Sequence, residues 1–377
     1  MKLLVTGANG FVGRNLYAAL RRREGISLRG YDLENTPEEL AAALQTADIV
    51  FHLAGVNRPQ TVEEFQRGNA GFTAEVCDQL EEFGRAPQIV LSSSVQAELD
   101  NPYGVSKREA EEVLRGFCER TGAAGVVYRL NNLFGKWCRP NYNSVTATFC
   151  YNVAHDLPIQ ISDPSRELDL TYIDDVVAAF LAELDPPSRP GCRFAGQLPS
   201  YTISLGELAD RIRSFRDSRS GLLAPDFADP LNRRLYATYL SYLEPDDFAY
   251  SLDQKTDARG ALAEFVKSPP FGQVFVSRTK PGVTRGNHYH DTKTEKFLVV
   301  EGEGIIRFRK LGTEEVLEYP VSGREFRVVD IPPGYTHSIE NVGEGEMVTL
   351  FWACEVFDSS SSDTHAEVVL PPEKVSP

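Results

Sequence analysis

The chain has 377 residues, 42% of them hydrophobic and 25% charged, which suits a globular protein with two packed domains. Its formal net charge of -15 argues against nucleic acid or an anionic membrane surface as the main partner. It has no apolar run of the ~20 residues that a membrane span requires, and no signal peptide is apparent. Its six cysteines include no C-x-x-C pair. We therefore expect a cytoplasmic protein with reduced thiols.

Residues 1–135 alternate short apolar runs with longer segments of helical periodicity. Runs rich in β-branched residues predict strands at 2–6, 26–32, 47–55, 87–94 and 125–135, and helical spacing occupies segments such as 11–23 and 103–120. This alternation predicts an α/β domain of the Rossmann type, a doubly wound parallel sheet with helices on both faces.

The rest of the chain changes character twice. Helices are expected near 143–154, 173–184 and 204–215, and we interpret this region as a small substrate lobe on the sheet. Short strands with Gly and Pro turns then follow at 272–279, 295–302, 304–310, 326–334 and 346–357, which predicts an all-β barrel or sandwich. The predicted domains are therefore 1–245 and 246–377.

The segment "TGANGFVG" follows the first predicted strand and opens the first helix. Glycines there allow a tight turn and the close approach of a pyrophosphate to backbone N–H groups at a helix N-terminus. Asp32, at the end of the second strand, can accept a hydrogen bond from a ribose 2′-hydroxyl and would repel a 2′-phosphate, which favours NAD over NADP. The residues predicted to bind the dinucleotide are Gly7, Gly10, Phe11, Val12, Gly13, Asp32, Leu53, Ala54, Tyr103 and Lys107.

The segment "NPYGVSK" places Tyr103 and Lys107 four residues apart, on one face of a helix. An ammonium group beside a phenol lowers the pKa of the phenol and prepares it to exchange a proton with a carbonyl or alcohol oxygen. A hydroxyl at the end of the fourth strand, from Ser94 or Ser93, could hold the same oxygen. We therefore predict Ser94, Tyr103 and Lys107 as the catalytic residues of an oxidoreductase.

These motifs resemble those of the extended short-chain dehydrogenase/reductases: "TGANGFVG", "HLAG" at 52–55, "SSS" at 92–94 and "YGVSK" at 103–107. The resemblance implies action on nucleotide-activated sugars. The spacing between Ser94 and Tyr103 is shorter than is usual in that superfamily, so the choice of the assisting hydroxyl stays open between Ser93 and Ser94.

Two segments of the second half resemble the two cupin motifs. The first has Gly282, His288, His290, Glu295 and Gly302, and the second has Pro332, Gly334, His337 and Asn341, with Phe326 where a glycine is usual. His288 and His290 are expected on one face of a strand. Together with Glu295 and His337 they would offer three nitrogens and one oxygen to Zn, Fe, Mn or Ni. His52 and His155 are expected to be structural, and the role of His365 is left open.

A sugar-type reductase followed by a cupin resembles the CapF-type family of capsular polysaccharide enzymes, over nearly the whole chain. The resemblance implies a homodimer that binds a divalent metal, with Zn our first choice. It implies that the cupin domain epimerises C3 of a UDP-2-acetamido-2,6-dideoxy-4-keto-hexose. The reductase domain then reduces the C4 ketone with NADPH, and the product is a precursor of UDP-N-acetyl-L-fucosamine. NADPH is taken first from the resemblance, with NADH second from Asp32.

Substrate contacts are predicted from the segments "YRLNNLFG", "NYNSV" and "SRELDLTYIDD". The candidates are Arg129, Asn132, Asn143 and Arg166, with Arg166 as the candidate for the diphosphate; helix capping by Asn143 and surface ion pairs of the arginines are the alternatives. The acid and base of the cupin are not identified by the sequence; the neighbouring candidates are Lys293, Lys296 and Tyr335.

Three other functions compete with a bifunctional enzyme. The first is a reductase whose metal-binding cupin serves only dimerisation and substrate gating. The second is a dinucleotide-binding redox sensor, which is disfavoured because sensors can dispense with Tyr103 and Lys107. The third is an iron-dependent cupin dioxygenase, which does not account for the reductase half.

Overall fold

The computed structural model describes residues 1–185 and 190–370. The chain divides into two compact units, one made of Met1–Arg213 and Ala228–Glu244, the other of Ser214–Phe227 and the chain from Pro245 onward. The inserted segment belongs to the second unit because the backbone of Lys267 donates to Leu222 O (2.7 Å) and accepts from Ala224 N (2.8 Å). A single boundary near residue 245 does not represent this interleaving.

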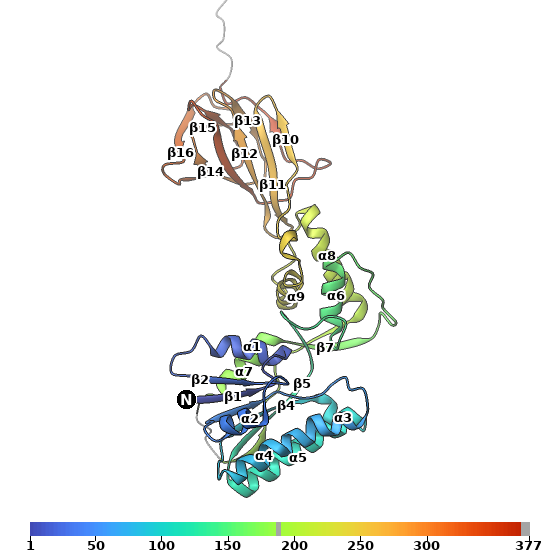
Figure 1. Cartoon of the computed structure of the whole chain (residues 1–377). Helices are drawn as coiled ribbons and strands as arrows, with labels where there is room; N and C mark the ends of the chain where they lie inside the picture. Colours follow the sequence, from blue (N-terminus) through green and yellow to red (C-terminus); the bar gives the residue numbers. More distant parts are fainter. Residues whose placement is uncertain (186–189, 371–377) are drawn as a thin grey trace, which may run out of the picture. The chain divides into compact units, whose positions relative to one another are not determined.

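A six-stranded parallel sheet forms the centre of the first unit, in the order β2-β1-β3-β4-β5-β8. Its strands are β1 (Lys2–Thr6), β2 (Ser27–Tyr31), β3 (Ile49–His52), β4 (Gln88–Ser94), β5 (Ala124–Leu130) and β8 (Gly191–Phe194). One face is covered by α1 (Phe11–Leu20) and α7 (Ile173–Ala182), the other by α2 (Pro37–Leu44), α4 (Phe72–Glu82) and α5 (Pro102–Thr121) (Figure 1). The predicted doubly wound sheet is confirmed.

Both faces of this sheet are apolar, as a parallel sheet between two helical layers requires. Side chains of successive residues in β1 divide between the layers: Leu4 joins the cluster under α2, α4 and α5, and Leu3 and Val5 join the cluster under α1 and α7. The prediction that 173–184 belongs to the lobe was wrong, because Ile173 and Phe180 of α7 lie in the second of these clusters. The strand β8 was not predicted.

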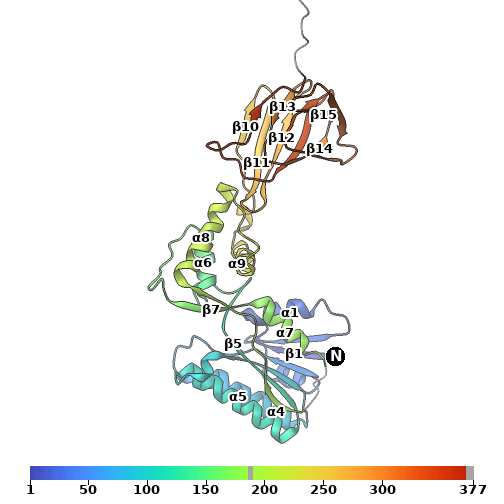
Figure 2. The same ribbon diagram turned by 180° about the vertical axis from the view of Figure 1, so that it is seen from behind.

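A smaller set of elements lies outside this sheet and begins directly after the carboxyl end of β5 (Figure 2). It contains a three-stranded sheet of β6 (Asn132–Phe134), β7 (Glu167–Tyr172) and β9 (Tyr201–Ser204), in the order β6-β7-β9. The helices α6 (Val145–Ala154) and α9 (Pro230–Leu240) pack together here, and α8 (Leu205–Gly221) begins here. The helix α9 was not predicted; Asp229 is its N-cap and Pro230 its first residue.

The short helical segments of the structure are α3 (Glu63–Gln66), the π-helical turn η1 (Arg67–Gly71), and the 3₁₀ turns η2 (Val95–Glu98) and η3 (Pro245–Asp247).

The second unit is built from two antiparallel sheets that enclose an apolar core, so the all-β prediction is confirmed. Their orders are β10-β11-β12-β19-β14-β17 and β16-β15-β18-β13-β20. Residues of the core come from both sheets, among them Phe297, Phe351, Ile306 and Ile339. The strands are β10 (Gln254–Asp257), β11 (Gly260–Ser268), β12 (Gly272–Thr279), β13 (Thr284–Tyr289), β14 (Glu295–Glu301), β15 (Glu303–Lys310), β16 (Val316–Ser322), β17 (Val328–Ile331), β18 (Tyr335–Asn341), β19 (Met347–Ala353) and β20 (His365–Ala366).

Within residues 1–185 and 190–370, no helix has the length and apolar character that crossing a membrane requires.

Candidate functional site

The loop between β1 and α1 leaves room for a phosphate group only because it is made of glycines. Gly7 has a φ of +67°, and a Cβ on it would lie 2.7 Å from Ala54 N. A Cβ on Gly13 would lie 2.0 Å from Gly7 O. The N-cap of α1 is Gly10, which has no side chain to cap the first N–H groups of the helix. This arrangement fits a pyrophosphate, with Leu53 and Ala54 lying against the loop.

Two carboxylates lie at the point where the adenosine ribose of a bound dinucleotide would be expected. Asp32, directly after β2, accepts a hydrogen bond from Asn9 N at 2.7 Å, and Glu34 accepts one from Asn9 Nδ2 at 2.9 Å. Both acids therefore meet at the phosphate loop. Sequence reasoning identified Asp32 and missed Glu34, because the contact of Glu34 with Asn9 joins residues 25 positions apart in the chain.

Tyr103 and Lys107 lie in the first turns of α5, whose N-cap Asn101 accepts from Gly104 N at 2.8 Å. The Lys107 ammonium is buried and donates to Ser92 O at 2.6 Å. Burial lowers the pKa of Lys107 to about 8, although Glu111 opposes this shift. Burial raises the pKa of Tyr103, and its hydrogen bond with Ser94 acts in the opposite direction.

The two candidate hydroxyls differ in their partners. Ser93 donates to the buried carboxylate of Glu111 at 2.5 Å, whereas Ser94 contacts Tyr103 and accepts from Gln96 N at 3.2 Å. The structure therefore brings Ser94, and not Ser93, to the phenol.

Arg129 is held by carboxylates of its own domain. Its Nε and Nη2 donate to Glu111 at 3.0 and 2.6 Å, and its Nη1 donates to Glu98 at 2.9 Å. Its guanidinium also lies over the ring of Phe194, 4.7 Å from the ring centroid. These contacts satisfy the side chain without a substrate, so the alternative stated above, an ion-paired arginine, describes Arg129.

The Glu111 carboxylate should stabilise the first unit measurably. Glu111→Gln is expected to lower the free energy of unfolding by about 2 kcal/mol, because a buried anion that pairs with Arg129 is removed while Arg129 remains 27% exposed. Glu98→Gln is the matched control, since Glu98 is 71% exposed, and should cost less than about 0.5 kcal/mol. Urea unfolding followed by helical circular dichroism measures both; equal losses would contradict the assignment.

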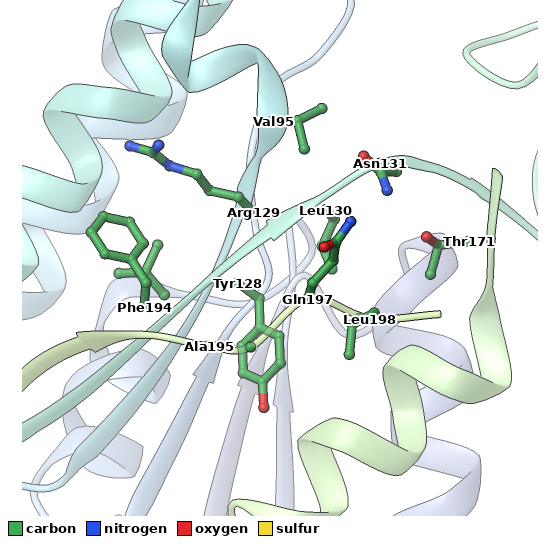
Figure 3. Close-up of a pocket in the computed structure, with 12 residues that line it drawn as sticks. Val95, Tyr128, Arg129, Leu130, Asn131, Thr171, Phe194, Ala195, Gln197 and Leu198 are labelled. Atoms are coloured by element: carbon green, nitrogen blue, oxygen red, sulfur yellow. The ribbon is translucent and has the colours of Figure 1, made fainter. Parts of the chain in front are cut away.

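A pocket of about 330 Å³ opens at the carboxyl end of β5 (Figure 3). Val95, the residue after Ser94, lines it. Figure 3 shows the amide of Gln197 turned into it, whereas the guanidinium of Arg129 is turned away toward a helix. The hydroxyl of Thr171, which lines the pocket, is buried without a hydrogen-bond partner among the described residues. The polar lining residues that sequence reasoning missed are Asn131, Thr171 and Gln197. Asn131 lies in the strand predicted at 125–135, whereas Thr171 lies in β7 and Gln197 follows β8, and neither of these strands was predicted.

The other predicted substrate residues are exposed. Asn132, at the start of β6, donates weakly to Asp169 O at 3.4 Å. Asn143 precedes α6, and the N-cap of that helix is Ser144, which accepts from Ala147 N, so the capping alternative for Asn143 was wrong. Arg166 precedes β7.

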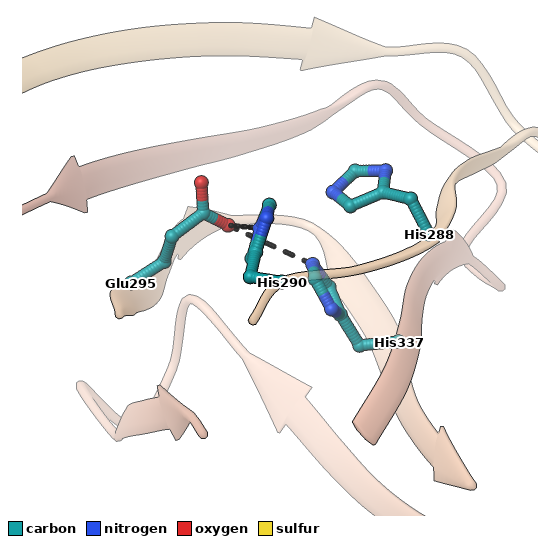
Figure 4. A group of neighbouring side chains, drawn as sticks. All are labelled: His288, His290, Glu295 and His337. Carbon is teal, nitrogen blue, oxygen red and sulfur yellow. Dashed lines mark ion pairs between the residues drawn. The ribbon is translucent and has the colours of Figure 1, made fainter. Parts of the chain in front are cut away.

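The second unit contains a cluster of His288, His290, Glu295 and His337, whose ligand atoms all lie within 4.8 Å of one another (Figure 4). His290 Nε2 and His337 Nε2 lie 3.5 and 3.6 Å from Glu295 Oε2. His290 follows β13 rather than lying within it, because the strand has an irregularity between Gly286 and His288 and ends at Tyr289.

The chemistry of the cluster fits a divalent transition metal. His290 Nδ1 donates to Asp363 O at 2.5 Å, which leaves Nε2 as an acceptor facing the cluster. His290 Nε2 and both ring nitrogens of His337 are buried without a hydrogen-bond partner among the described residues. Burial, together with the other two histidines, lowers the pKa of His288 to about 4. Neutral imidazoles and an ionised carboxylate are the forms that bind a metal.

The three residues considered for proton transfer at the histidine cluster differ in their distance from it. Lys293 is buried, with Nζ 3.5 Å from Glu295 Oε1. Lys296, one residue further along β14 than Glu295, points away and pairs with the exposed Asp330. Tyr335 packs its ring against Phe308 in the core. Lys293 alone of the three reaches the cluster.

The remaining histidines have local partners. His52 is buried between the hydroxyls of Thr6 and Thr73, and His155 contacts Glu244 at 2.9 Å. His365 stacks on Tyr289 and lies near Asp291 and Asp363.

These features define a dinucleotide-binding enzyme fold joined to a barrel with a metal-type cluster. Residues 3–191 match the NAD dependent epimerase/dehydratase family, and residues 255–365 match the polysaccharide biosynthesis C-terminal domain. The chain is 46% identical over 366 residues to the UDP-2-acetamido-2,6-beta-L-arabino-hexul-4-ose reductase of Pseudomonas aeruginosa, covering 97% of this chain and 98% of that protein.

Solved structures give the same result. The crystal structure of the capsular polysaccharide assembling protein CapF from Staphylococcus aureus is 46% identical, with a TM-score of 0.91, and the match covers 98% of this chain and 100% of that one. The UDP-glucuronic acid 4-epimerase of Bacillus cereus in complex with NAD is 19% identical over 64% of this chain, with a TM-score of 0.54, and shares the fold alone. The chain belongs to the CapF family of hexul-4-ose reductases.

Proposed function

We propose that this protein inverts C3 of a UDP-2-acetamido-2,6-dideoxy-4-keto-hexose in its barrel and then reduces the C4 ketone in its first unit. The presence of both sites in one chain carries the proposal: Tyr103, Lys107 and Ser94 suit ketone reduction, and the histidine cluster suits enolisation. The similarity to the hexul-4-ose reductase of P. aeruginosa supports the reduction step. The proposed product is UDP-2-acetamido-2,6-dideoxy-L-talose, a precursor for capsule or O-antigen synthesis.

In the reduction, a reduced nicotinamide held by the glycine loop would supply the hydride to C4. Tyr103 donates its phenolic proton to the former ketone oxygen, and the Lys107 ammonium stabilises the phenolate that remains. Ser94, in contact with Tyr103, donates a hydrogen bond to the same oxygen. The raised pKa of Tyr103 keeps the phenol in the protonated form that this direction requires.

For the hydride donor, the resemblance favours NADPH and the residues favour NADH. A 2′-phosphate beside Asp32 would meet a second carboxylate, that of Glu34, on the same Asn9. The contacts of Asp32 and Glu34 among the described residues are with uncharged N–H groups, which do not offset the repulsion between these carboxylates and a 2′-phosphate. We therefore propose NADH as the preferred donor.

In the epimerisation, the C4 ketone acidifies the C3 proton because the resulting carbanion is delocalised as an enolate. A divalent metal held by the cluster would supply positive charge to the enolate oxygen. A base removes the C3 proton from one face and an acid returns a proton to the opposite face; the ammonium of Lys293, which lies at the cluster, is the proposed acid. Reduction of C4 afterwards fixes the new stereocentre, because the alcohol no longer enolises.

Exchange of the C3 proton tests the proposal directly. The metal-loaded protein is incubated in D₂O with the UDP-4-keto-hexose and no nicotinamide, and the C3–H signal is followed by NMR. We expect the signal to disappear with the wild type and with Tyr103→Phe, and to persist with His337→Ala. Lys293→Met should slow the exchange, whereas Lys296→Met, the matched control, should not.

No exchange in the wild type, with reduction still occurring when NADH or NADPH is added, would contradict the epimerase step. The barrel would then be a metal-ordered module for dimerisation, and the enzyme a simple reductase. We also propose that the protein forms a homodimer. Light scattering, at the protein concentrations used in the activity measurements, gives the molar mass that checks this.

A further inference from the structure

Two arginines of the first unit surround one tyrosine ring at the edge where the substrate is expected. The guanidinium carbon of Arg58 lies 5.7 Å from the centroid of the Tyr142 ring, and that of Arg139 lies 5.1 Å from it. Arg58 follows β3, and Arg139 and Tyr142 lie between β6 and α6. Both arginine side chains are exposed.

The pair carries positive charge that the described part of the chain does not neutralise. Neither Arg58 nor Arg139 forms an ion pair with a carboxylate within residues 1–185 and 190–370. Other arginines of this acidic protein do, among them Arg129, Arg211 and Arg234. Stacking on an aromatic face offsets part of the repulsion between two guanidinium groups, but leaves their N–H donors free for an anion.

The loop that bears Arg58 is tied to the catalytic helix. Asn69 accepts from Val56 N and donates to Val56 O, at 2.9 and 3.0 Å, and also donates to Ser106 Oγ at 2.9 Å. Ser106 in turn donates to Tyr103 O at 2.8 Å. The position of Arg58, two residues after Val56, is thereby set relative to the phenol.

The segment that bears Arg139 is fixed on both sides. Tyr242 donates to Cys138 O at 2.6 Å, and Asn141, with a φ of +55°, donates its backbone N–H to Thr148 Oγ1 at 3.0 Å. Two cations are thus fixed to a single ring, next to the exposed Asn143.

We propose that Arg58 and Arg139 bind the diphosphate of the UDP-sugar, with Tyr142 as a positioning residue that holds the two guanidiniums together. This inference rests on the proposed function and names the residues that recognise its substrate class. Guanidinium groups bind phosphate oxygens through paired N–H donors, which a sugar hydroxyl does not require.

The test compares UDP with uridine by isothermal titration calorimetry, with NAD⁺ present in excess to occupy the dinucleotide site. The wild type should bind UDP more tightly than uridine. Arg58→Gln and Arg139→Gln should each weaken UDP binding by about tenfold and leave uridine binding unchanged, and the double variant should lose the preference for UDP. Tyr142→Phe should behave as the wild type, and Tyr142→Leu should weaken UDP binding.

Arg213→Gln is the matched control, because Arg213 is an exposed arginine of the same unit whose carboxylate partner among the described residues is Asp210 on its own helix. It should bind both ligands as the wild type does. Steady-state reduction by the two variants should show a raised KM for the UDP-sugar with kcat retained. If the double variant Arg58→Gln with Arg139→Gln keeps the full preference for UDP over uridine, the diphosphate assignment is wrong, and the proposed function is unaffected. A wild type that neither binds UDP nor reduces the keto-sugar would overturn the proposed function as well.

Discussion

Tyr103→Phe is expected to lower the rate of ketone reduction by about 10³-fold, because the proton donor is lost while the ring and its packing remain. The loss should fall on kcat, since the variant keeps the Phe65 contact of the ring and the Lys107 ammonium. Stopped-flow measurement of reduced nicotinamide oxidation at saturating UDP-4-keto-hexose checks this. UDP binding by the variant should equal that of the wild type, and a rate within tenfold of the wild type would contradict the assignment.

The pH dependence of the same reaction should report Lys107. Its ammonium favours reduction by stabilising the phenolate, and burial lowers its pKa to about 8 from an ordinary value near 10.5. The cation is therefore present below that pH and is lost above it. We expect kcat for reduction to be constant below about pH 8 and to fall with the loss of one proton at higher pH. Lys107→Arg should move this fall to a higher pH, because a guanidinium stays charged.

A preference for NADH over NADPH of about a hundredfold in affinity is the second large effect expected. A 2′-phosphate about 6 Å from a carboxylate, at an effective dielectric constant of about 20, is disfavoured by roughly 3 kcal/mol. Fluorescence quenching on titration with each reduced nucleotide measures the two dissociation constants without turnover. Asp32→Asn should reduce the preference by about tenfold, and the double variant Asp32→Asn with Glu34→Gln should nearly abolish it.

Glu24→Gln is the control for these variants, since Glu24 is an exposed carboxylate between α1 and β2 that the phosphate loop does not contact. It should leave both affinities unchanged. A wild type that binds NADPH as tightly as NADH would contradict the role given to the two acids, and would make NADPH the donor that the resemblance implied.

The two folds were predictable from local pattern. Alternating β-branched runs and helical periodicity identified the parallel sheet, because a strand buried on both faces is apolar along its whole length. The helix α9 and the strand β18 were missed for the opposite reason. Both are rich in polar residues, and β18, "YTHSIEN", is a strand because it pairs with β15 and β13 on either side.

The reactive groups were likewise visible in the sequence, but not their partners. Short motifs identified the glycine loop and the Tyr103–Lys107 pair, because each lies within one short segment of the chain. Two such motifs identified the four metal-type residues. Motif spacing could not decide which of the two hydroxyls, that of Ser93 or that of Ser94, contacts Tyr103. The choice depends on Glu111 of α5, whose carboxylate takes the Ser93 hydroxyl.

The sequence by itself determined the architecture and the chemical types of both sites, because hydrophobic periodicity and motif spacing are local properties of the chain. The tertiary structure decided which charges are already neutralised. It pairs Arg129 with Glu111, brings Glu34 back to Asn9 beside Asp32, and leaves Arg58 and Arg139 without carboxylate partners among the described residues. Charge compensation depends on contacts between segments far apart in the chain, and such contacts exist only once the fold has formed.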